Sequence, residues 1–477
     1  MLLRRERLGQ ISENVLEFIS SREADQWIFE ADLLVDRAHL VMLKERGLIS
    51  SEDFSEIVEA LGKIVESKLG EGEDVHEAIE AELISRIGTV GGRMHTGRSR
   101  NDEVATCIRI ALRDQVLSLM EELRVLAQVL VKKAEENTET IVPGFTHLQH
   151  AQPTTLAHHL LAHADAFFRD FDRLKDTYPR VNLSPLGAAA FASTGFDIDR
   201  ERTAQLLGFE GLVENSMDAV STRDFILEVM SELAILMTNL SRLAEEIILW
   251  STSEFGYLEI DDLFASTSSI MPQKKNPDTA ELVRGKTGSV IGSLVSALTI
   301  CKALPMSYNR DLQEVTPNLW RSVSLSRSAV RIMAGCIDSA VFNHDRLEIN
   351  ASAGFSTATE IADSLVRVTR IPFRTAHQIV GALAAMGDDP TMEDLDSAAQ
   401  RVAEITPSKM GFTDEMLDTA LDPKKNVALR DRTGGPAPSE TRRMVQARFT
   451  KVKENERLVR VMQKKMNLAL ESLKSMR

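Results

Sequence analysis

Cysteine and long apolar runs are both scarce in this sequence. Three cysteines, Cys107, Cys301 and Cys336, occur in 477 residues, too few and too scattered for a disulfide framework or a thiolate metal site. No stretch reaches the roughly 18 apolar residues of a membrane-spanning helix, and the first ten residues carry three arginines rather than the apolar core of a secretory signal. These absences favour a cytoplasmic protein with reduced cysteines.

The sequence also has fewer positively charged than negatively charged residues. The chain carries 56 Lys and Arg against 71 Asp and Glu, a net charge of -15, which disfavours non-specific attraction to nucleic-acid backbones or anionic membranes. We therefore expect neither as a partner. Because 43% of the residues are hydrophobic, the chain can bury a substantial core.

The clearest helical stretch is 217–252, which contains neither glycine nor proline, and we expect one helix of about 50 Å there. Its apolar residues recur at alternating spacings of four and three, typical of a helix in a bundle: Ile226, Met230, Leu233, Met237, Leu240, Ala244 and Ile247. Further apolar residues surround this seam: Phe225, Val229, Leu236, Leu243 and Trp250. We expect neighbouring subunits to cover part of so wide an apolar surface.

Similar patterns predict helices over 102–138, 154–177 and 277–301, with Pro277 in a first helical turn. The basic, amphipathic tail 441–477 predicts a terminal helix that packs on the body of the protein, with partner binding as the alternative. No alternation of β-branched residues is long enough for a sheet, and no internal repeat occurs. The predicted fold class is therefore all-α.

Residues 91–101 form a glycine-rich, basic loop that opens directly into a predicted helix. Glycine lets backbone amides approach a ligand, Arg100 can bind a carboxylate, and Asn101 lies where a helix N-terminus presents free N–H groups. The loop thus predicts an anion site, and the alternative is a basic turn that caps the helix. The glycine spacing is not that of a phosphate-binding P-loop.

Residues 143–153 form a polar loop closed by proline. Thr146 and Gln149 offer donors for a substrate carboxylate. His147 and His150 bring the imidazole side chain, a type that can change charge near neutral pH. A structural role for His147 is the alternative reading.

A metal site must also be weighed, because His150, His158, His159 and His163 follow one another closely. The His-Glu-x-x-His motif is missing, and the pair His159 and His163 has no obvious third ligand nearby in the sequence. We therefore expect no metal.

Residues 266–277, continuing to Glu281, combine small residues and two prolines with Lys274, Lys275 and Asn276. Such a composition suits a mobile lid that carries anion-binding groups. Taken alone, it is equally typical of an exposed loop.

These motifs carry a family resemblance. Residues 268–281 resemble the Ser-Ser-x-Met-Pro-x-Lys-x-Asn and Glu signature of the fumarase, aspartase and argininosuccinate lyase superfamily. Segments 95–102, 146–149 and 308–314 are similar to the argininosuccinate lyase family in particular. The resemblance is detailed over 21–314 and looser beyond, and four separated motifs in the right order argue against chance.

The resemblance implies three helical domains, placed here at 1–98, 99–349 and 350–477, with a long central bundle that assembles into a tetrameric core. It implies active sites shared between subunits, and elimination of fumarate from argininosuccinate to release L-arginine in arginine biosynthesis. It implies no metal and no organic cofactor.

The resemblance also implies roles for individual residues. Ser268 would be the base that removes a carbon-bound proton, with Lys274 and Asn276 binding the carboxylate that gains charge. His147, paired with Glu281, would act near the leaving guanidino group. The residues that would bind substrate are Ser21, Ser99, Arg100, Asn101, Thr146 and Gln149, with Tyr308, Arg310 and Gln313 on the arginine portion.

Two residues depart from the family pattern: Thr267 replaces a common glycine and Thr316 a substrate-binding lysine. The nearest rival is another lyase of the superfamily, acting on adenylosuccinate, aspartate or malate. A serine hydrolase built from Ser268, His147 and Glu281 would lack the Gly-x-Ser-x-Gly elbow. A purely structural protein, like the lens crystallins of this family, is disfavoured because the residues with implied catalytic roles are retained.

Overall fold

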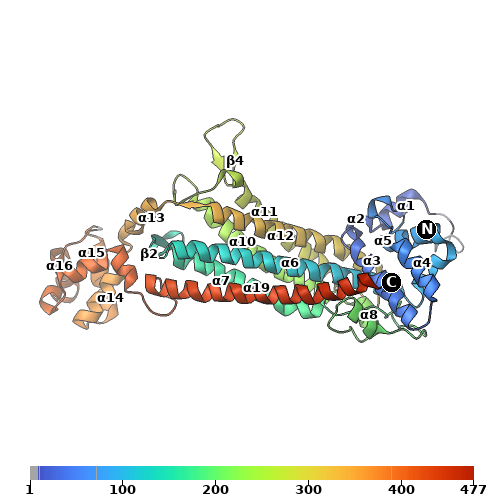
Figure 1. The fold of residues 1–477 in the computed structure, drawn as a ribbon. Helices are drawn as coiled ribbons and strands as arrows, with labels where there is room; N and C mark the ends of the chain where they lie inside the picture. Colours follow the sequence, from blue (N-terminus) through green and yellow to red (C-terminus); the bar gives the residue numbers. More distant parts are fainter. Residues whose placement is uncertain (1–8, 10, 71, 388, 477) are drawn as a thin grey trace.

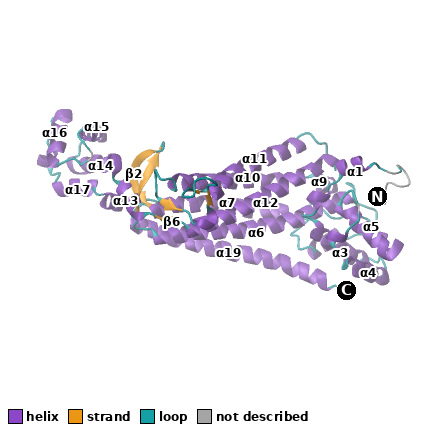
Figure 2. Cartoon of the chain, turned by 90° about the horizontal axis from the view of Figure 1, so that it is seen from above, coloured by secondary structure: helices purple, strands orange, loops and turns teal. Residues whose placement is uncertain are grey.

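The computed structural model describes residues 9, 11–70, 72–387 and 389–476. Helices dominate this part of the chain, and the few strands form short two-stranded ribbons. The predicted all-α class is confirmed (Figures 1 and 2). No described helix combines the length and the apolar character that crossing a membrane requires.

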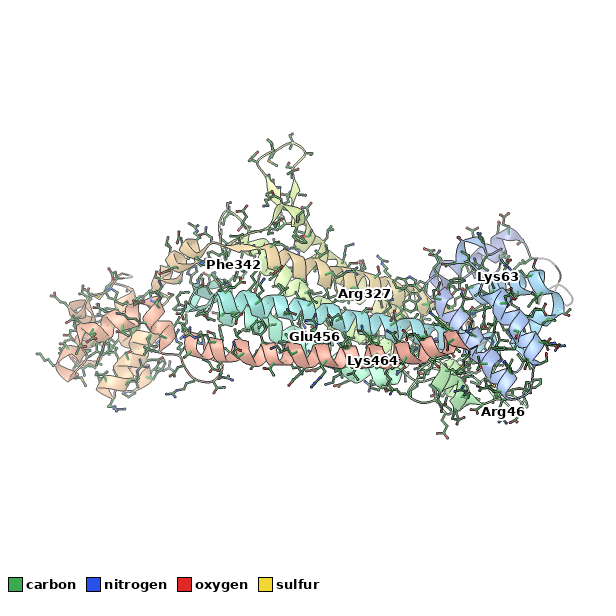
Figure 3. The ribbon with its side chains drawn as sticks, viewed as in Figure 1. Arg46, Lys63, Arg327, Phe342, Glu456 and Lys464 are labelled. Carbon is green, nitrogen blue, oxygen red and sulfur yellow. The ribbon has the colours of Figure 1, made fainter. Side chains whose placement is uncertain are left out.

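Six long helices run side by side and form the central bundle (Figure 1). They are α6 (Arg100–Glu136), α7 (Leu156–Val181), α10 (Asp224–Trp250), α11 (Asp278–Cys301), α12 (Val315–Ser339) and α19 (Pro438–Ser475). With 37 residues, α6 is about 55 Å long. Polar contacts also join helices of the bundle: Arg327 of α12, labelled in Figure 3, donates to Glu122 of α6 at 2.7 Å.

Shorter helices cap both ends of the bundle (Figure 1). At one end lie α1 (Glu13–Ile19), α2 (Arg22–Asp25), α3 (Phe29–Glu45), α4 (Ser51–Leu61), α5 (Val75–Ile87), α8 (Arg200–Leu206) and α9 (Ser216–Ser221), with the 3-10 turns η1 (Glu66–Lys68) and η2 (Gly88–His95). At the other lie α13 (His344–Ala351), α14 (Ala358–Thr369), α15 (Phe373–Ala384), α16 (Met392–Ala403), α17 (Asp414–Leu421) and α18 (Pro423–Ala428), with η5 (Ala353–Phe355) and η6 (Pro407–Met410).

The helices α14 to α17 have a small apolar core of their own, separate from that of the bundle. The chain then returns along α6 and α7 as α19, which confirms the predicted terminal helix apart from Arg477, which lies outside the described residues. The predicted domain boundaries stay a prediction. Helix α19 belongs to the predicted third domain, but its buried residues are part of the core of the bundle.

The single helix predicted over 217–252 is wrong. The structure has two helices, α9 and α10, with Thr222 extended between them. The buried guanidinium of Arg223 donates to the carbonyls of Val220, at 3.3 Å, and Thr222, at 2.8 Å. These carbonyls therefore bond a side chain instead of continuing a helical ladder.

The expectation that neighbouring subunits cover the apolar surface of this helix is also wrong. The apolar residues named above for this helix are buried within a single chain, because α7, α11 and α12 pack against α10. Ile235, on the same helix, is 41% exposed. Exposed apolar side chains lie on α11 instead: Leu282, Ile291, Val295 and Leu298. Beside them, Gly285, Gly288 and Gly292 leave open space where a side chain would stand.

Three antiparallel ribbons join these helices. They pair β1 (Ile141–Thr146) with β2 (Gln149–Thr155), β3 (Leu258–Glu259) with β6 (Val341–Phe342), and β4 (Ser266–Thr267) with β5 (Lys275–Asn276). The last two have strands of two residues, too short for an alternating pattern to predict them.

Candidate active site

A cavity of about 210 Å³ lies where the N-terminal helices meet the start of α6 and the 3-10 turn η4 (Arg310–Glu314). Six of the predicted substrate-binding residues line it: Ser21, Arg100, Asn101, Tyr308, Arg310 and Gln313. Thr316, which departs from the family pattern, lines it as well. The fold thus brings together residues that lie almost 300 positions apart in the sequence.

The N-terminus of α6 opens at this cavity. Ser99 is its N-cap and forms a capping box with Asp102. The Ser99 hydroxyl accepts from the backbone N–H of Asp102, and the Asp102 carboxylate accepts from the backbone N–H of Ser99. The same Asp102 carboxylate accepts from the backbone N–H groups of Gly187 at 2.9 Å and Ala189 at 2.8 Å. This network fixes the helix end that favours a bound anion.

The cavity wall carries both signs of charge. Arg100 pairs with Asp74 at 3.0 Å, and Arg310 pairs with Glu73. Gln313 donates to the carbonyl of Ile19 at 3.1 Å, which ties η4 to the N-terminal helices. A ligand with both carboxylate and cationic nitrogen groups would find complementary partners here.

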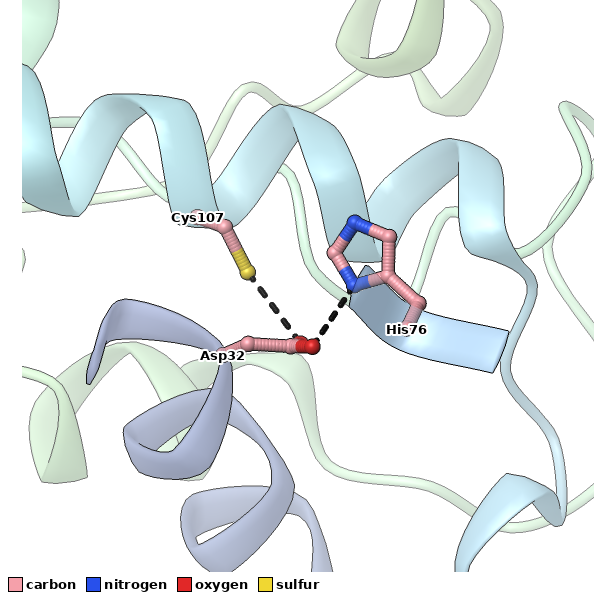
Figure 4. Close-up of side chains that lie close together, drawn as sticks. All are labelled: Asp32, His76 and Cys107. Atoms are coloured by element: carbon pink, nitrogen blue, oxygen red, sulfur yellow. Dashed lines mark hydrogen bonds and ion pairs between the residues drawn. The ribbon is translucent and has the colours of Figure 1, made fainter. Parts of the chain in front are cut away.

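A buried polar cluster supports one wall of the cavity (Figure 4). His76 lines the cavity, and its Nδ1 lies 2.8 Å from a carboxylate oxygen of Asp32. The thiol of Cys107 donates to the other oxygen of Asp32 at 3.5 Å. Among the described residues, Nε2 of His76 has no hydrogen-bond partner.

The charge state of His76 follows from these neighbours. Burial lowers its pKa, but Asp32 and Glu103 outweigh burial and hold the pKa well above the ordinary 6.5. These neighbours therefore favour the protonated form of the ring, in which the Nδ1–H donates to Asp32. Sequence reasoning missed His76, because its partner Asp32 lies 44 positions away.

The predicted residues of the 143–153 loop lie at the opposite end of α6. Thr146 and Gln149 face each other across the β1–β2 hairpin, and the two residues between them turn the chain. Both turn residues have left-handed backbones, with φ of 55° at His147 and 58° at Leu148, as in the type I′ turn that favours Asn and Gly. The turn presents His147 to solvent.

The third group of predicted residues lies on the loop between β4 and β5, which projects from the bundle (Figure 1). Ser268 begins this loop, and its hydroxyl oxygen accepts from the backbone N–H groups of Ile270 at 3.3 Å and Met271 at 3.1 Å. Lys274 is exposed near its end, and Glu281 is exposed in the first turn of α11.

A single chain therefore holds the predicted residues in three separate groups: the cavity, the hairpin and the projecting loop. About 55 Å of α6 lies between the first two. No group by itself brings Ser268, His147 and the cavity together.

Comparison with known proteins identifies the class. A family model described as "Lyase" matches residues 19–292, and one described as "Argininosuccinate lyase C-terminal" matches residues 355–428. The fold resembles a class II fumarase from Schistosoma mansoni, with a TM-score of 0.70 at 16% identity over 86% of this chain and 92% of that one. The chain is a lyase of the fumarase and aspartase superfamily.

Individual relatives narrow the assignment. An argininosuccinate lyase of Methanothrix thermoacetophila is 67% identical, over 94% of this chain and 93% of that protein. One from Methanocaldococcus jannaschii is 49% identical over 99% of both. A crystal structure of EDDS lyase in complex with formate matches with a TM-score of 0.88 at 33% identity, over 94% of this chain and 91% of that one. The chain belongs to the argininosuccinate lyase family and is a carbon–nitrogen lyase.

Proposed function

We propose that this enzyme eliminates fumarate from argininosuccinate and releases L-arginine, in arginine biosynthesis. The observation that carries the proposal is the cavity, in which Arg100 and the α6 N-terminus suit carboxylates, while Glu73 and Asp74 suit a guanidino or amino group. Its relatives named argininosuccinate lyase support the same substrate.

For the chemical step we propose Ser268 as the base. Two backbone N–H groups already point at its hydroxyl oxygen, and such donors favour the alkoxide that a serine base requires. The alkoxide takes the proton from the carbon beside a carboxylate. The electron pair left on carbon then forms the double bond of fumarate as the carbon–nitrogen bond breaks.

The remaining groups would stabilise the charge that develops during the reaction and protonate the leaving group. Lys274 and Asn276 would stabilise the carboxylate into which the carbanion charge spreads. His147, paired with Glu281, would be positively charged and would help protonate the departing guanidino nitrogen. Thr146 and Gln149 on the same hairpin, and Ser99 at the α6 N-cap, would hold the fumarate portion.

These roles require the three groups to come from different chains, so we propose a homotetramer with shared active sites. The exposed apolar residues of α11, which are between 42% and 59% exposed, supply a face that a second copy can cover. The neighbouring glycines allow a helix to approach this face closely.

An assay with purified protein tests the substrate. Argininosuccinate should yield fumarate, followed by its ultraviolet absorption, whereas adenylosuccinate and aspartate should yield none. Fumarate from either control substrate, with none from argininosuccinate, would assign the chain to a rival activity within the superfamily.

A further inference from the structure

Three metal-ligand side chains converge where α7 packs on α10. His159 and His163 lie four residues apart on α7, so both imidazoles lie on one face of that helix. Glu246 reaches them from α10: its Oε2 lies 2.5 Å from Nε2 of His159 and 2.8 Å from Nε2 of His163. One ligand atom from each side chain lies within 4.8 Å of the others.

We propose that His159, His163 and Glu246 form a binding site for one divalent transition-metal ion, for which Zn²⁺ is best suited. Two imidazole nitrogens and one carboxylate oxygen, with water in a fourth position, are an established ligand set for zinc. The imidazoles favour zinc, cobalt or nickel over magnesium and calcium, which prefer oxygen ligands. The site is separate from the residues assigned above to the elimination reaction.

The distances fit this assignment with little movement. Zinc bonds of about 2.0–2.2 Å in tetrahedral geometry place neighbouring ligand atoms about 3.3 Å apart. The two N···O separations, 2.5 and 2.8 Å, would need to open by about 0.5–0.8 Å to reach it. Rotation of the Glu246 side chain would have to supply this opening.

The surroundings favour a reachable and ordered site. The three side chains keep 28%, 12% and 35% of their surface exposed in the chain, so an ion can enter from solvent. The ring of Trp250 lies 4.8 Å from that of His159, between centroids, and restricts its orientation. A bound ion would link α7 to α10 and stabilise the folded bundle, because the unfolded chain does not hold these ligands together.

The test uses the full-length protein stripped of metal with a chelator. Calorimetric titration with Zn²⁺ should give one ion per chain, and Co²⁺ should give the intense visible absorption of a tetrahedral site. Both His163→Asn and Glu246→Gln should lose the bound ion and the rise in Tm that Zn²⁺ produces. The matched control is His377→Gln, which removes an exposed histidine on α15 and should keep both.

The alternative is a hydrogen-bonded connection between helices that needs no ion. It predicts no stoichiometric binding to the wild type, or binding that persists in both variants, and either result overturns the proposal. Glu246→Gln is the decisive variant if His163→Asn fails to fold, because glutamine keeps the shape and a hydrogen-bonding oxygen. Circular dichroism of the metal-free variants establishes that each is folded before titration.

Discussion

Ser268 differs from an ordinary surface serine in that two backbone N–H groups converge on its oxygen. Replacing it with alanine should leave folding and substrate affinity nearly unchanged and reduce turnover by about a thousandfold or more, equal to roughly 4 kcal/mol of transition-state stabilisation. Single-turnover kinetics of fumarate release would measure the loss.

The neighbouring Ser269 provides the matched control, because its side chain lies on the same loop and is exposed. Ser269→Ala should keep turnover within a few-fold of the wild type. If Ser268→Ala retained about a tenth of normal turnover with chemistry rate-limiting, the base would have to be another group, and His147 would be the first candidate.

His76 gives the folded protein a pH dependence. Its folded-state pKa is raised above that of the unfolded chain, so its stabilising contribution is complete below about pH 6.5 and is lost as pH rises through the folded-state value. The free energy of unfolding should therefore fall more steeply between neutral and alkaline pH in the wild type than in His76→Gln. Urea denaturation over this range measures both slopes, and equal slopes would contradict the assignment.

Whether a candidate functional residue could be predicted depends on whether its sequence motif is local. Ser268, Lys274 and Arg100 belong to short motifs, so the sequence alone singles them out. His76 and Glu246 act through partners that lie 44 to 87 positions away, and only the packing of separate helices brings those partners together. No pattern within one segment could have predicted them.

At the scale of elements, the β1–β2 hairpin is strained at its turn. Leu148 has a left-handed backbone although 73% of its side chain is exposed and gains little from packing. Leu148→Gly should therefore stabilise the protein by about 1 kcal/mol, since the left-handed conformation costs a non-glycine residue roughly 1–2 kcal/mol.

The urea midpoint of unfolding would report this gain. Leu263→Gly is a suitable comparison, because Leu263 is also exposed but has no left-handed backbone, and it should not stabilise the protein. A loss of stability in Leu148→Gly would mean that the leucine makes contacts outside the chain.

The long helices were predictable as elements because their apolar periodicity extends over many turns. The five helical segments expected from the sequence correspond to α6, α7, α10, α11 and α19 within a few residues at most ends. The break at Thr222 was not predictable, because it depends on where the buried Arg223 guanidinium finds its acceptors. Periodicity reports which face is buried but does not report such side-chain bonds.

At the scale of the whole molecule, the proposed tetramer makes a test by complementation possible. His147→Asn and Ser268→Ala chains should each be inactive, yet tetramers that contain both should recover part of the activity. Recovery follows if some sites take His147 from one chain and Ser268 from another, so that both residues are intact there.

Mixed tetramers can be made by unfolding and refolding the two variants together and separated by distinct affinity tags. The control is refolding of each variant alone, which should stay inactive. Confirmed hybrids without any recovered activity would place His147 and Ser268 of one site on the same chain. A stable, active monomer in sedimentation would contradict the tetramer itself.

The return of the chain along the bundle has a consequence for how this protein is made. The last helix, α19, packs on α6, and Arg37 near the start of the chain donates to the carbonyls of Leu473, at 3.1 Å, and Met476, at 2.7 Å. At about 5–20 residues per second, the ribosome needs roughly 20 s or more after α3 emerges to supply these partners. The first helices therefore remain incompletely covered until α19 has been synthesised. Apolar surface that is transiently exposed in this way is what chaperones shield on nascent chains.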